Sequence, residues 1–327
     1  MNLEQLQSFV EVARLGHFTR AAEQLHLAQP SLSRQIATLE HDLGAELFHR
    51  ARGHIRLTAA GETLLPLARR MLADADSARR KMAELSGLQR GRVRLGATPT
   101  LCISLVAEVL SAFRAAHPGI DLHIVERGSR GLVEELAGGA LDMAIITATD
   151  GLAAVAGSLQ HTPLLAEELV VVSSAANPPV SRHPAINLAE LSKLPLVAFH
   201  ESYDLRVTTD AAFRAAGLEP TVAVEGAEMD AVLRFVERGL GVAVVPAMVL
   251  LDRPSLRSVR LAESPATAAA PAGPLSAEPQ LLRTISLAHR SDVNPTPAAH
   301  AMQAMIISVA DELTSDGSAL ARWVTRV

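Results

Sequence analysis

The sequence predicts an α/β fold with an all-α winged helix-turn-helix head followed by two similar α/β lobes. Three observations support this prediction. Residues 18–50 read as two short helices joined by a tight turn and closed by strands. Residues 58–88 carry apolar side chains in alternating steps of four and three, which indicates one long helix. From residue 93 onward, short apolar strands alternate with helices that end at glycines, as in sheets covered by helices.

The chain begins with a helix that supports the head. Asn2 precedes Gln5 by three residues, which is the spacing of a capping box. Leu3, Leu6 and Val10 follow at helical spacing and predict a buried stripe. We therefore expect this helix to pack against the two helices that follow it.

Residues 18–43 predict two helices in close contact. We expect Thr19 to cap the first helix, in which the small side chains of Ala21 and Ala22 let the second helix approach. A helix tolerates proline only in its first turn, so Pro30 marks the start of the second helix. The apolar positions of that helix recur at helical spacing and face inward: Leu32, Ile36, Leu39 and Leu43.

The opposite face of the second helix is polar in its first turns. Such side chains can donate and accept hydrogen bonds at the base edges of a DNA major groove, although a solvated helical hairpin would show the same pattern. The next segment favours the interpretation as a DNA-binding unit. Apolar residues at 47–48 and at 55 and 57 predict two short strands, and the basic tip between them is suited to phosphate. The polar face carries Gln29, Ser31, Ser33, Arg34 and Gln35.

Residues 9–61, which end in Leu57-Thr58-Ala59-Ala60-Gly61, resemble the LysR-type transcriptional regulators in spacing and residue type. The resemblance implies double-stranded promoter or operator DNA as a partner. One position departs from the family pattern, because Ala28 stands where a serine usually caps the recognition helix, at a cost of roughly 1 kcal/mol. Carried over position by position, the expected DNA contacts are Gln29, Pro30, Ser33 and Arg34, with Ser31 beside them, and Arg50 and Arg52 in the wing.

Composition excludes several classes of protein. The longest apolar run, at 240–251, is too short to span a bilayer, and the N-terminus lacks a basic-then-apolar signal. We therefore expect a cytoplasmic protein with no membrane partner. The net charge of −5 does not argue against DNA, because phosphate contact needs only a local cluster of cations such as Arg34, Arg50, Arg52 and Arg56.

Metals and cofactors are not expected. Cys102 is the only cysteine, so neither an internal disulfide nor a thiol-rich zinc site can form. The 12 histidines show no His-Glu-x-x-His spacing. A redox role for Cys102 lacks a second thiol that could resolve an oxidised sulfur.

The long helix that follows the wing has the pattern of a dimer seam. We expect Thr58 to cap it and Pro66 to bend it slightly. A helix packed on its own chain is the alternative, but a two-fold DNA site needs two heads, so we expect a homodimer. The resemblance suggests a homotetramer. The predicted seam comprises Leu64, Ala68, Met71, Ala75, Ala78, Met82 and Leu85.

The second half resembles the two-lobed, periplasmic-binding-protein-like effector domain of the same family. We expect a winged head at 1–58, a linker and dimerisation helix at 59–90, an effector domain at 91–315 and a tail at 316–327. Within the effector domain, lobe I covers about 91–163 and 280–315, and lobe II about 164–265. The Ala/Pro-rich segment 264–279 reads as a loop and is longer than the family suggests.

A small-molecule effector should bind beyond the carboxyl ends of the strands, where loops and helix N-termini converge. Hydroxyl groups at helix N-termini favour an anion, so a small carboxylate is the first expectation. Several of these side chains have a second interpretation as helix caps or surface groups. The expected effector contacts are Thr98, Thr100, Cys102, Ser129, Thr147, His200, Tyr203 and Ala227, with Arg130 and Arg206 as weaker candidates.

Together these features predict a LysR-type transcriptional regulator whose promoter activity responds to an effector bound between two lobes. A cytoplasmic solute-binding protein and an effector-independent repressor are the alternatives. An enzyme is not expected, because no nucleophile elbow occurs and Gly239-Leu240-Gly241 leads into a strand, unlike a dinucleotide fingerprint.

Overall fold

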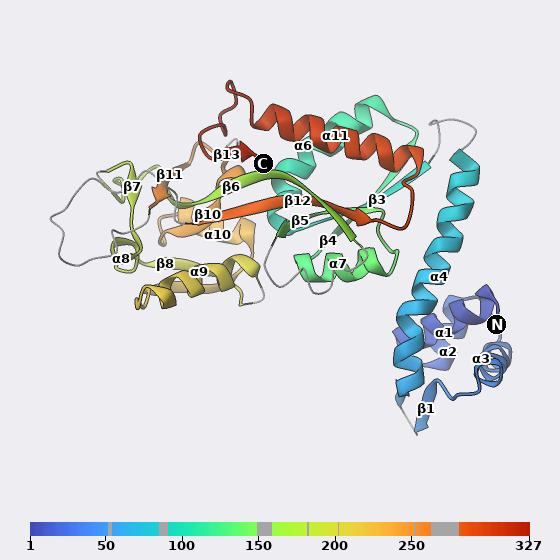
Figure 1. The fold of residues 1–327 in the computed structure, drawn as a ribbon. Coiled ribbons are helices and arrows are strands. Elements are labelled where there is room, and N and C mark those ends of the chain that lie inside the picture. The colour runs from blue at the N-terminus through green and yellow to red at the C-terminus, as the bar shows by residue number, and fades with distance from the viewer. Residues whose placement is uncertain are drawn as a thin grey trace.

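A computed structural model shows a small helical head, a long helix and a two-lobed body (Figure 1). The structure describes residues 1–51, 54–84, 91–148, 159–181, 183–201, 203–251, 253–262 and 281–327. The head lies at one end of the long helix and the body at the other. The two sites expected from the sequence are therefore far apart in the chain's fold.

The head contains three helices and a two-stranded wing. Asn2 and Gln5 form the predicted capping box. The second helix begins at Phe18 with His17 as its N-cap, so the expected cap at Thr19 is wrong; Thr19 already lies in the first turn. The elements are α1 (Leu3–Leu15), α2 (Phe18–Gln24), α3 (Gln29–Leu43), β1 (Phe48–Ala51) and β2 (His54–Leu57).

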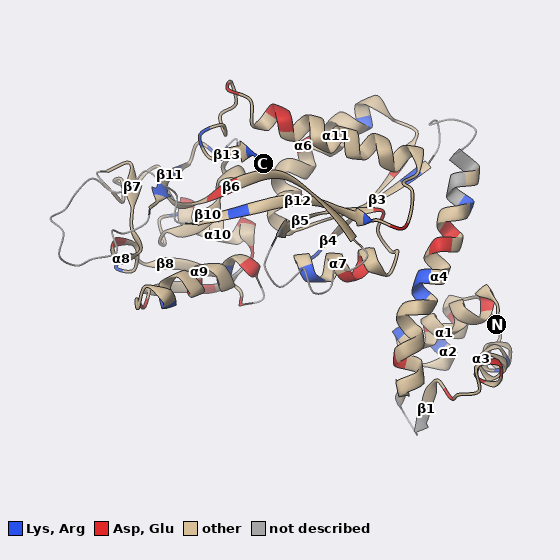
Figure 2. Cartoon of the chain, viewed as in Figure 1, with Lys and Arg blue, Asp and Glu red and all other residues tan. Residues whose placement is uncertain are grey.

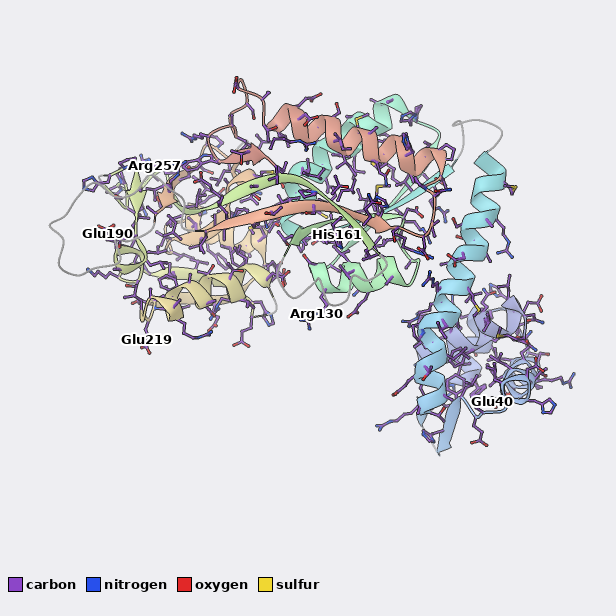
Figure 3. All side chains as sticks on the ribbon, viewed as in Figure 1. Glu40, Arg130, His161, Glu190, Glu219 and Arg257 are labelled. Carbon is purple, nitrogen blue, oxygen red and sulfur yellow. The ribbon has the colours of Figure 1, made fainter. Side chains whose placement is uncertain are left out.

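Aromatic packing joins the wing to the helices of the head. The ring of Phe48 lies 5.4 Å from that of Phe9 and 5.9 Å from that of Phe18, measured between centroids. Glu40 on α3 accepts a hydrogen bond of 2.9 Å from the backbone N–H of Leu47 (Figure 3). These contacts fix the wing relative to α3, because strand β1 follows Leu47 directly.

The long helix α4 (Ala59–Glu84) leaves the wing and runs toward the body. The backbone N–H of Gly61 donates to the Thr58 hydroxyl at 3.1 Å, which is the predicted cap. A Cβ atom at Gly61 would lie 2.2 Å from the carbonyl oxygen of Leu47, so only glycine allows this close approach of helix and wing.

Only part of the predicted seam on α4 faces away from its own chain. Ala68 is fully buried in the core of the head, and Leu64 packs beside it. At these two positions α4 packs on its own chain, which was the alternative to a dimer seam, because the amino-terminal half of α4 packs against α1. The seam residues Met71 (39% exposed) and Met82 (65%) face outward, and so does Leu67 (50%), which is not a seam position. Leu85 lies outside the described residues.

Lobe I is a parallel three-stranded unit with helices on both faces. Strand β3 pairs in parallel with β4 and β5. One face packs against α6 and α11, and the other against α7. The elements are β3 (Gly91–Ala97), α5 (Pro99–Leu101), the π-helix η1 (Cys102–Val106), α6 (Ala107–Ala116), β4 (Ile120–Glu126), α7 (Ser129–Ala137), β5 (Met143–Ala148) and α11 (Pro297–Leu313).

Lobe II repeats the alternation of strands and helices. Strands β8 and β9 pair in parallel, and Leu196 bridges in parallel to Val242 just before β10. The elements are β7 (Ala185–Ile186), α8 (Leu188–Leu191), β8 (Leu196–Phe199), α9 (Asp204–Ala215), β9 (Val222–Ala227), α10 (Met229–Glu237), β10 (Ala243–Pro246), η2 (Ala247–Leu250) and β11 (Leu256–Leu261).

Two long antiparallel strands connect the lobes. Strand β12 (Leu282–Arg290) lies between β5 of lobe I and β6 (Leu159–Ser174). The later half of β6 pairs with β10 and β11 of lobe II. The predicted boundary at 163/164 therefore falls within one continuous strand. Strand β12 joins β5 to β6, and β6 continues into lobe II, so these two strands form the connection between the lobes.

The last residues, expected from the sequence as a tail at 316–327, lie against the body. Strand β13 (Val324–Arg326) pairs antiparallel with β6. Leu320 and Val324 are buried in the core of lobe I, and Trp323 packs at its edge. Burial of these apolar side chains explains why the segment is ordered against the sheet.

One stretch of the described residues, Pro99–Ala116, is long and apolar enough to cross a bilayer, with a mean hydropathy of 1.4. Core helices pass the same test. Leu101, Leu105 and Phe113 are fully buried and pack against α11 in the core of lobe I. We therefore assign this helix to the core.

Candidate functional site

The first candidate site is the polar face at the start of α3. Gln29, Pro30, Ser31 and Arg34 are exposed there, and Ser33 is half-buried. The side-chain amide of Gln29 donates to the Ser33 hydroxyl at 2.9 Å, so the two groups hold each other in the absence of a partner. The start of α3 thus presents donors and acceptors to solvent, as base readout requires.

Buried residues on the other face of α3 fix this surface. Leu32, Ile36 and Leu39 have no exposed area and pack in the core of the head. Gln35 receives a hydrogen bond from the buried Ser8 of α1, so it is turned toward the core rather than toward the polar face. As expected from Ala28 at the N-cap, no side chain caps α3.

The wing supplies the second part of this surface. Strands β1 and β2 pair in register, with Arg50 opposite Ile55 and His49 opposite Arg56. Arg56 is exposed on β2. Arg52 and the side chain of Arg50 lie outside the described residues.

The second candidate site is a cavity of about 190 Å³ between the lobes. It lies at the carboxyl ends of β3, β4 and β5 in lobe I and of β8 and β9 in lobe II, as the rule for open sheets predicts. Both lobes contribute to its walls. The lining residues are Thr98, Pro99, Thr100, Gly128, Thr147, Tyr203, Asp204, Leu205, Glu228 and Arg283.

Four predicted effector contacts line this cavity: Thr98, Thr100, Thr147 and Tyr203. The three threonines are buried in lobe I, and the hydroxyls of Thr98 and Thr100 lie 3.4 Å apart. Four other predicted contacts are not among its lining residues: Cys102, Ser129, His200 and Ala227. The side chain of Ala227 lies outside the described residues.

Ser129 and Cys102 face inward for different reasons. The Ser129 hydroxyl lies 3.0 Å from the Thr147 hydroxyl and accepts from the Thr147 backbone N–H at 3.3 Å, so Ser129 positions a lining residue. The Cys102 sulfur is 3.9 Å from the carbonyl oxygen of Ala97. Burial, with the charge of Glu126, raises the pKa of Cys102 to about 12, which keeps the thiol protonated and unreactive.

The predicted contact His200 and the weaker candidates Arg130 and Arg206 are not among the lining residues of the cavity. His200 is exposed at the end of β8. Arg206 is already bound by Asp210 and Glu225 and donates to the carbonyl oxygen of Phe199. Arg130 is exposed at the start of α7 (Figure 3).

Arg283 is a lining residue that the sequence interpretation missed. Its Nη1 donates to the Thr100 hydroxyl at 2.9 Å, and its Nε donates to Glu167 at 2.8 Å. Its Nη2 lies 2.7 Å from the same carboxylate oxygen but is buried and not aligned for a hydrogen bond. Glu167, which is fully buried, also accepts from the backbone N–H of Met248. The signal in the sequence that could have identified Arg283 is an arginine at the start of an otherwise apolar strand.

Two carboxylates of lobe II were also missed. Asp204 opens α9, and Glu228 is the N-cap of α10. The Tyr203 hydroxyl donates to Glu228. Burial and the charge of Glu228 raise the pKa of Tyr203, so the phenol keeps its proton. Both carboxylates follow strands whose carboxyl ends the sheet rule selects, which was the signal for them.

A third cluster joins α4 to lobe I, and we call it the latch: Arg70, Asp74, Arg290 and Asp292. Arg290 is 9% exposed and donates to Asp74 of α4 at 2.8 Å and to Asp292 at 3.0 Å. Arg70 of α4 also pairs with Asp292. Gly139 adopts φ +73°, and a Cβ there would lie 2.4 Å from the Cβ of Ala73. The latch therefore accompanies close packing of α4 on lobe I.

The described residues contain no group of three His, Cys, Asp or Glu side chains placed to hold a metal ion. The polar groups of the cavity are instead suited to an organic ligand with complementary charges.

A helix-turn-helix head carried on a long helix by a two-lobed body defines a DNA-binding transcriptional regulator. The chain belongs to the LysR family. Residues 3–62 match the bacterial regulatory helix-turn-helix protein, lysR family, and residues 86–311 match the LysR substrate binding domain.

Curated relatives and solved structures agree with this assignment. The chain is 31% identical over 261 residues to the uncharacterized HTH-type transcriptional regulator YybE of Bacillus subtilis, covering 80% of this chain and 88% of the relative. It is 32% identical to a probable nitrogen assimilation transcriptional activator of Synechococcus elongatus, covering 88% of each. A full-length OxyR variant from Pseudomonas aeruginosa shares the fold, with a TM-score of 0.66, 24% identity and 95% coverage of both chains.

These findings confirm the family resemblance, the winged helix-turn-helix head and the two-lobed effector-domain fold. They also confirm that the chain is a transcriptional regulator and not an enzyme.

Proposed function

We propose that this LysR-type regulator changes promoter activity in response to a small molecule, a small carboxylate, bound between the lobes. The observation that supports the proposal is the cavity, whose lining residues come from both lobes. A ligand that contacts both lobes binds best at one particular arrangement of the lobes. It therefore shifts the population of body conformations.

The DNA contacts are proposed for the head, residues 1–58. The exposed start of α3, with Gln29, Pro30, Ser31 and Arg34, would enter the major groove, while Ser33 supports Gln29. Arg50 and Arg52 would contact phosphate from the wing. Phosphate contacts carry most of the affinity and base contacts carry the specificity, so the two sets of residues have separable effects.

We propose a homodimer formed through α4, in the linker segment 59–90, and a homotetramer of two such pairs. The outward face of α4 carries Leu67, Met71 and Met82, a stripe of exposed apolar side chains. Met71 and Met82 belong to the predicted seam, and Leu67, which lies outside it, extends the stripe by one turn. A partner helix would bury it and would place two heads on a two-fold DNA site.

Strand β12 would connect the effector cavity to the head. Its two basic residues lie near its two ends (Figure 2): Arg283 lines the cavity and Arg290 belongs to the latch. They are seven positions apart in an extended strand, a distance of roughly 23 Å. Movement of β12 on ligand binding would reach α4 through Arg290 and Asp74. This gives a physical route by which two distant sites can influence each other.

The effector-binding part would extend from residue 91 to 327, with its lobes joined by β6 and β12, because β13 is part of the sheet. We propose a cytoplasmic location, where promoter DNA and small metabolites are both accessible.

The test is binding of the full-length protein to DNA from its own upstream intergenic region, measured by fluorescence anisotropy at several salt concentrations. We expect affinity that falls steeply with salt, and a change in affinity or footprint when a small carboxylate that stabilises the protein thermally is added. Salt-independent association, or none, would refute the DNA-binding part. The effector part fails if no ligand that binds the protein alters the DNA complex.

A further inference from the structure

The two walls of the cavity differ in charge. Lobe I contributes three threonines, a proline, Gly128 and Arg283, and no carboxylate. Lobe II contributes Tyr203, Leu205 and two carboxylates, Asp204 and Glu228, and no cation. A ligand that spans the cavity therefore meets hydrogen-bond donors on one side and negative charge on the other.

The lobe I wall is suited to a carboxylate. The nine-residue helix α7 starts at this wall, and no side chain caps it, because its N-cap is Gly128 and the Ser129 hydroxyl is bound to Thr147. Its first N–H groups are therefore available, and the helix dipole favours an anion. Arg283 is held in place by Glu167 and Thr100, so its guanidinium is oriented before any ligand arrives.

The lobe II wall is suited to a cation. Within the described part of the chain, neither Asp204 nor Glu228 forms an ion pair, and Glu228 accepts only the Tyr203 hydroxyl. Glu126, at the end of β4 in lobe I, also acts on Tyr203, although it does not line the cavity. A purely anionic ligand would be repelled here.

Helix capping explains only half of this arrangement. Asp204 and Glu228 each lie at the start of a helix, where the helix dipole favours negative charge, and this gives a structural reason for acidic residues at these positions. It gives no reason for both to face a cavity in which the described residues place no cation on the same side. A ligand cation supplies that missing charge.

We propose that the effector is a zwitterion of amino-acid size, with its carboxylate on lobe I and its protonated amine on lobe II. This inference rests on the proposed effector site and narrows its ligand class. The carboxylate binds at the start of α7 and at Thr100 and Arg283, and the ammonium group binds Glu228 and Asp204. A cavity of about 190 Å³ is many times larger than the roughly 10–15 Å³ that one water needs, so it has room for a ligand of amino-acid size.

The zwitterion also explains how ligand binding draws the lobes together. Each charged group of the ligand is satisfied by a different lobe, so the full interaction exists only when both walls are close enough. A plain carboxylate would bind lobe I alone and would have little preference for one arrangement of the lobes.

The test uses the full-length protein and a matched ligand series. The twenty common amino acids are screened by thermal shift, and each amino acid that binds is compared, by titration calorimetry, with its deaminated carboxylic acid and its decarboxylated amine. We expect one amino acid, or a few related ones, to bind at least tenfold more tightly than either analogue.

Variants then locate the amine. Glu228→Gln and Asp204→Asn should each lower the affinity for the amino acid at least tenfold. The affinity for the deaminated acid should stay the same or increase. Glu219→Gln is the matched control, because Glu219 is exposed on the same lobe away from the cavity (Figure 3). Neither test substitution removes a buried side chain, so folding should be retained and is checked by circular dichroism.

Failure of the inference is distinguishable from failure of the proposed function. If deaminated acids bind as tightly as the amino acids, or if Glu228→Gln strengthens binding of the amino acid, the zwitterion is refuted. The effector site itself stands if those acids alter the DNA complex. If no amino compound binds, the inference is refuted whether or not another class of ligand is found.

Discussion

The candidate site of the head is built from one short segment of the chain, whereas the candidate site of the body is built from many distant segments. The head exposes one face of one helix, and all the proposed recognition-helix contacts come from residues 29–34. The cavity of the body draws its lining from residues at or just beyond the carboxyl ends of five strands and from β12, with Arg283 and Thr100 separated by 183 residues in sequence. The comparison teaches that a surface site can be encoded locally, whereas an enclosed site depends on how distant segments meet.

The largest expected effect tests whether the two parts are independent. Leu32→Ala removes a side chain with no exposed area from the core of the head, which should destabilise the head by about 2–5 kcal/mol. DNA binding should be lost while effector binding by the body persists. Calorimetric melting and ligand titration check this expectation. Loss of ligand binding in the variant would show that head and body fold as one unit.

Arg34→Ala should weaken specific DNA binding by about 1–3 kcal/mol, because it removes a donor from the exposed start of α3. Arg52→Ala should instead lower affinity for all sequences alike, as loss of a phosphate contact does. Anisotropy titrations with operator and random DNA separate the two effects. If both variants bind like the parent, the contact assignment is wrong.

Thr100→Val should abolish the effector response through roughly a tenfold or greater loss of effector affinity, because it removes the acceptor that orients Arg283 at 2.9 Å. DNA binding without effector should be unchanged, since Thr100 lies in the body and far from the head. Titration calorimetry and anisotropy measure the two quantities on the same sample. Unchanged effector affinity would remove Thr100 from the site.

The latch should give the smallest effect. Asp74→Asn weakens a partly exposed ion pair, so stability should change by less than about 1 kcal/mol. Effector affinity should stay the same while the effector's influence on DNA binding decreases. An effector response equal to that of the parent would show that the latch does not connect the sites.

The latch also predicts a dependence on pH. The hydrogen bond from Arg290, opposed by burial, lowers the pKa of Asp292 below its ordinary value. A lowered carboxylate pKa stabilises the folded state above the unfolded value of about 3.9, and the contribution is lost as pH falls through the folded pKa. The difference between parent and Asp292→Asn should therefore be constant near neutral pH and should disappear in acid. Thermal melts between about pH 2 and 7 measure it.

Local rules determined much of this protein from the sequence alone. The Asn2–Gln5 capping box, the start of α3 at Pro30, the wing and the alternation of strands and helices follow from side-chain chemistry within a few residues. The edge at which a ligand should bind followed as well, because the carboxyl ends of parallel strands always meet at one edge of a sheet.

Only the tertiary structure decided which side chains face the cavity and which pack inward. Ser129 turns to Thr147, Ala68 faces its own head, and residues 324–326 pair with β6, none of which a local pattern specifies. Arg283 reaches Thr100 and Glu167 across more than a hundred residues of chain. Periodicity shows that a residue is on an inward or outward face, but the partner it meets depends on which elements pack together, and that is a property of the whole fold.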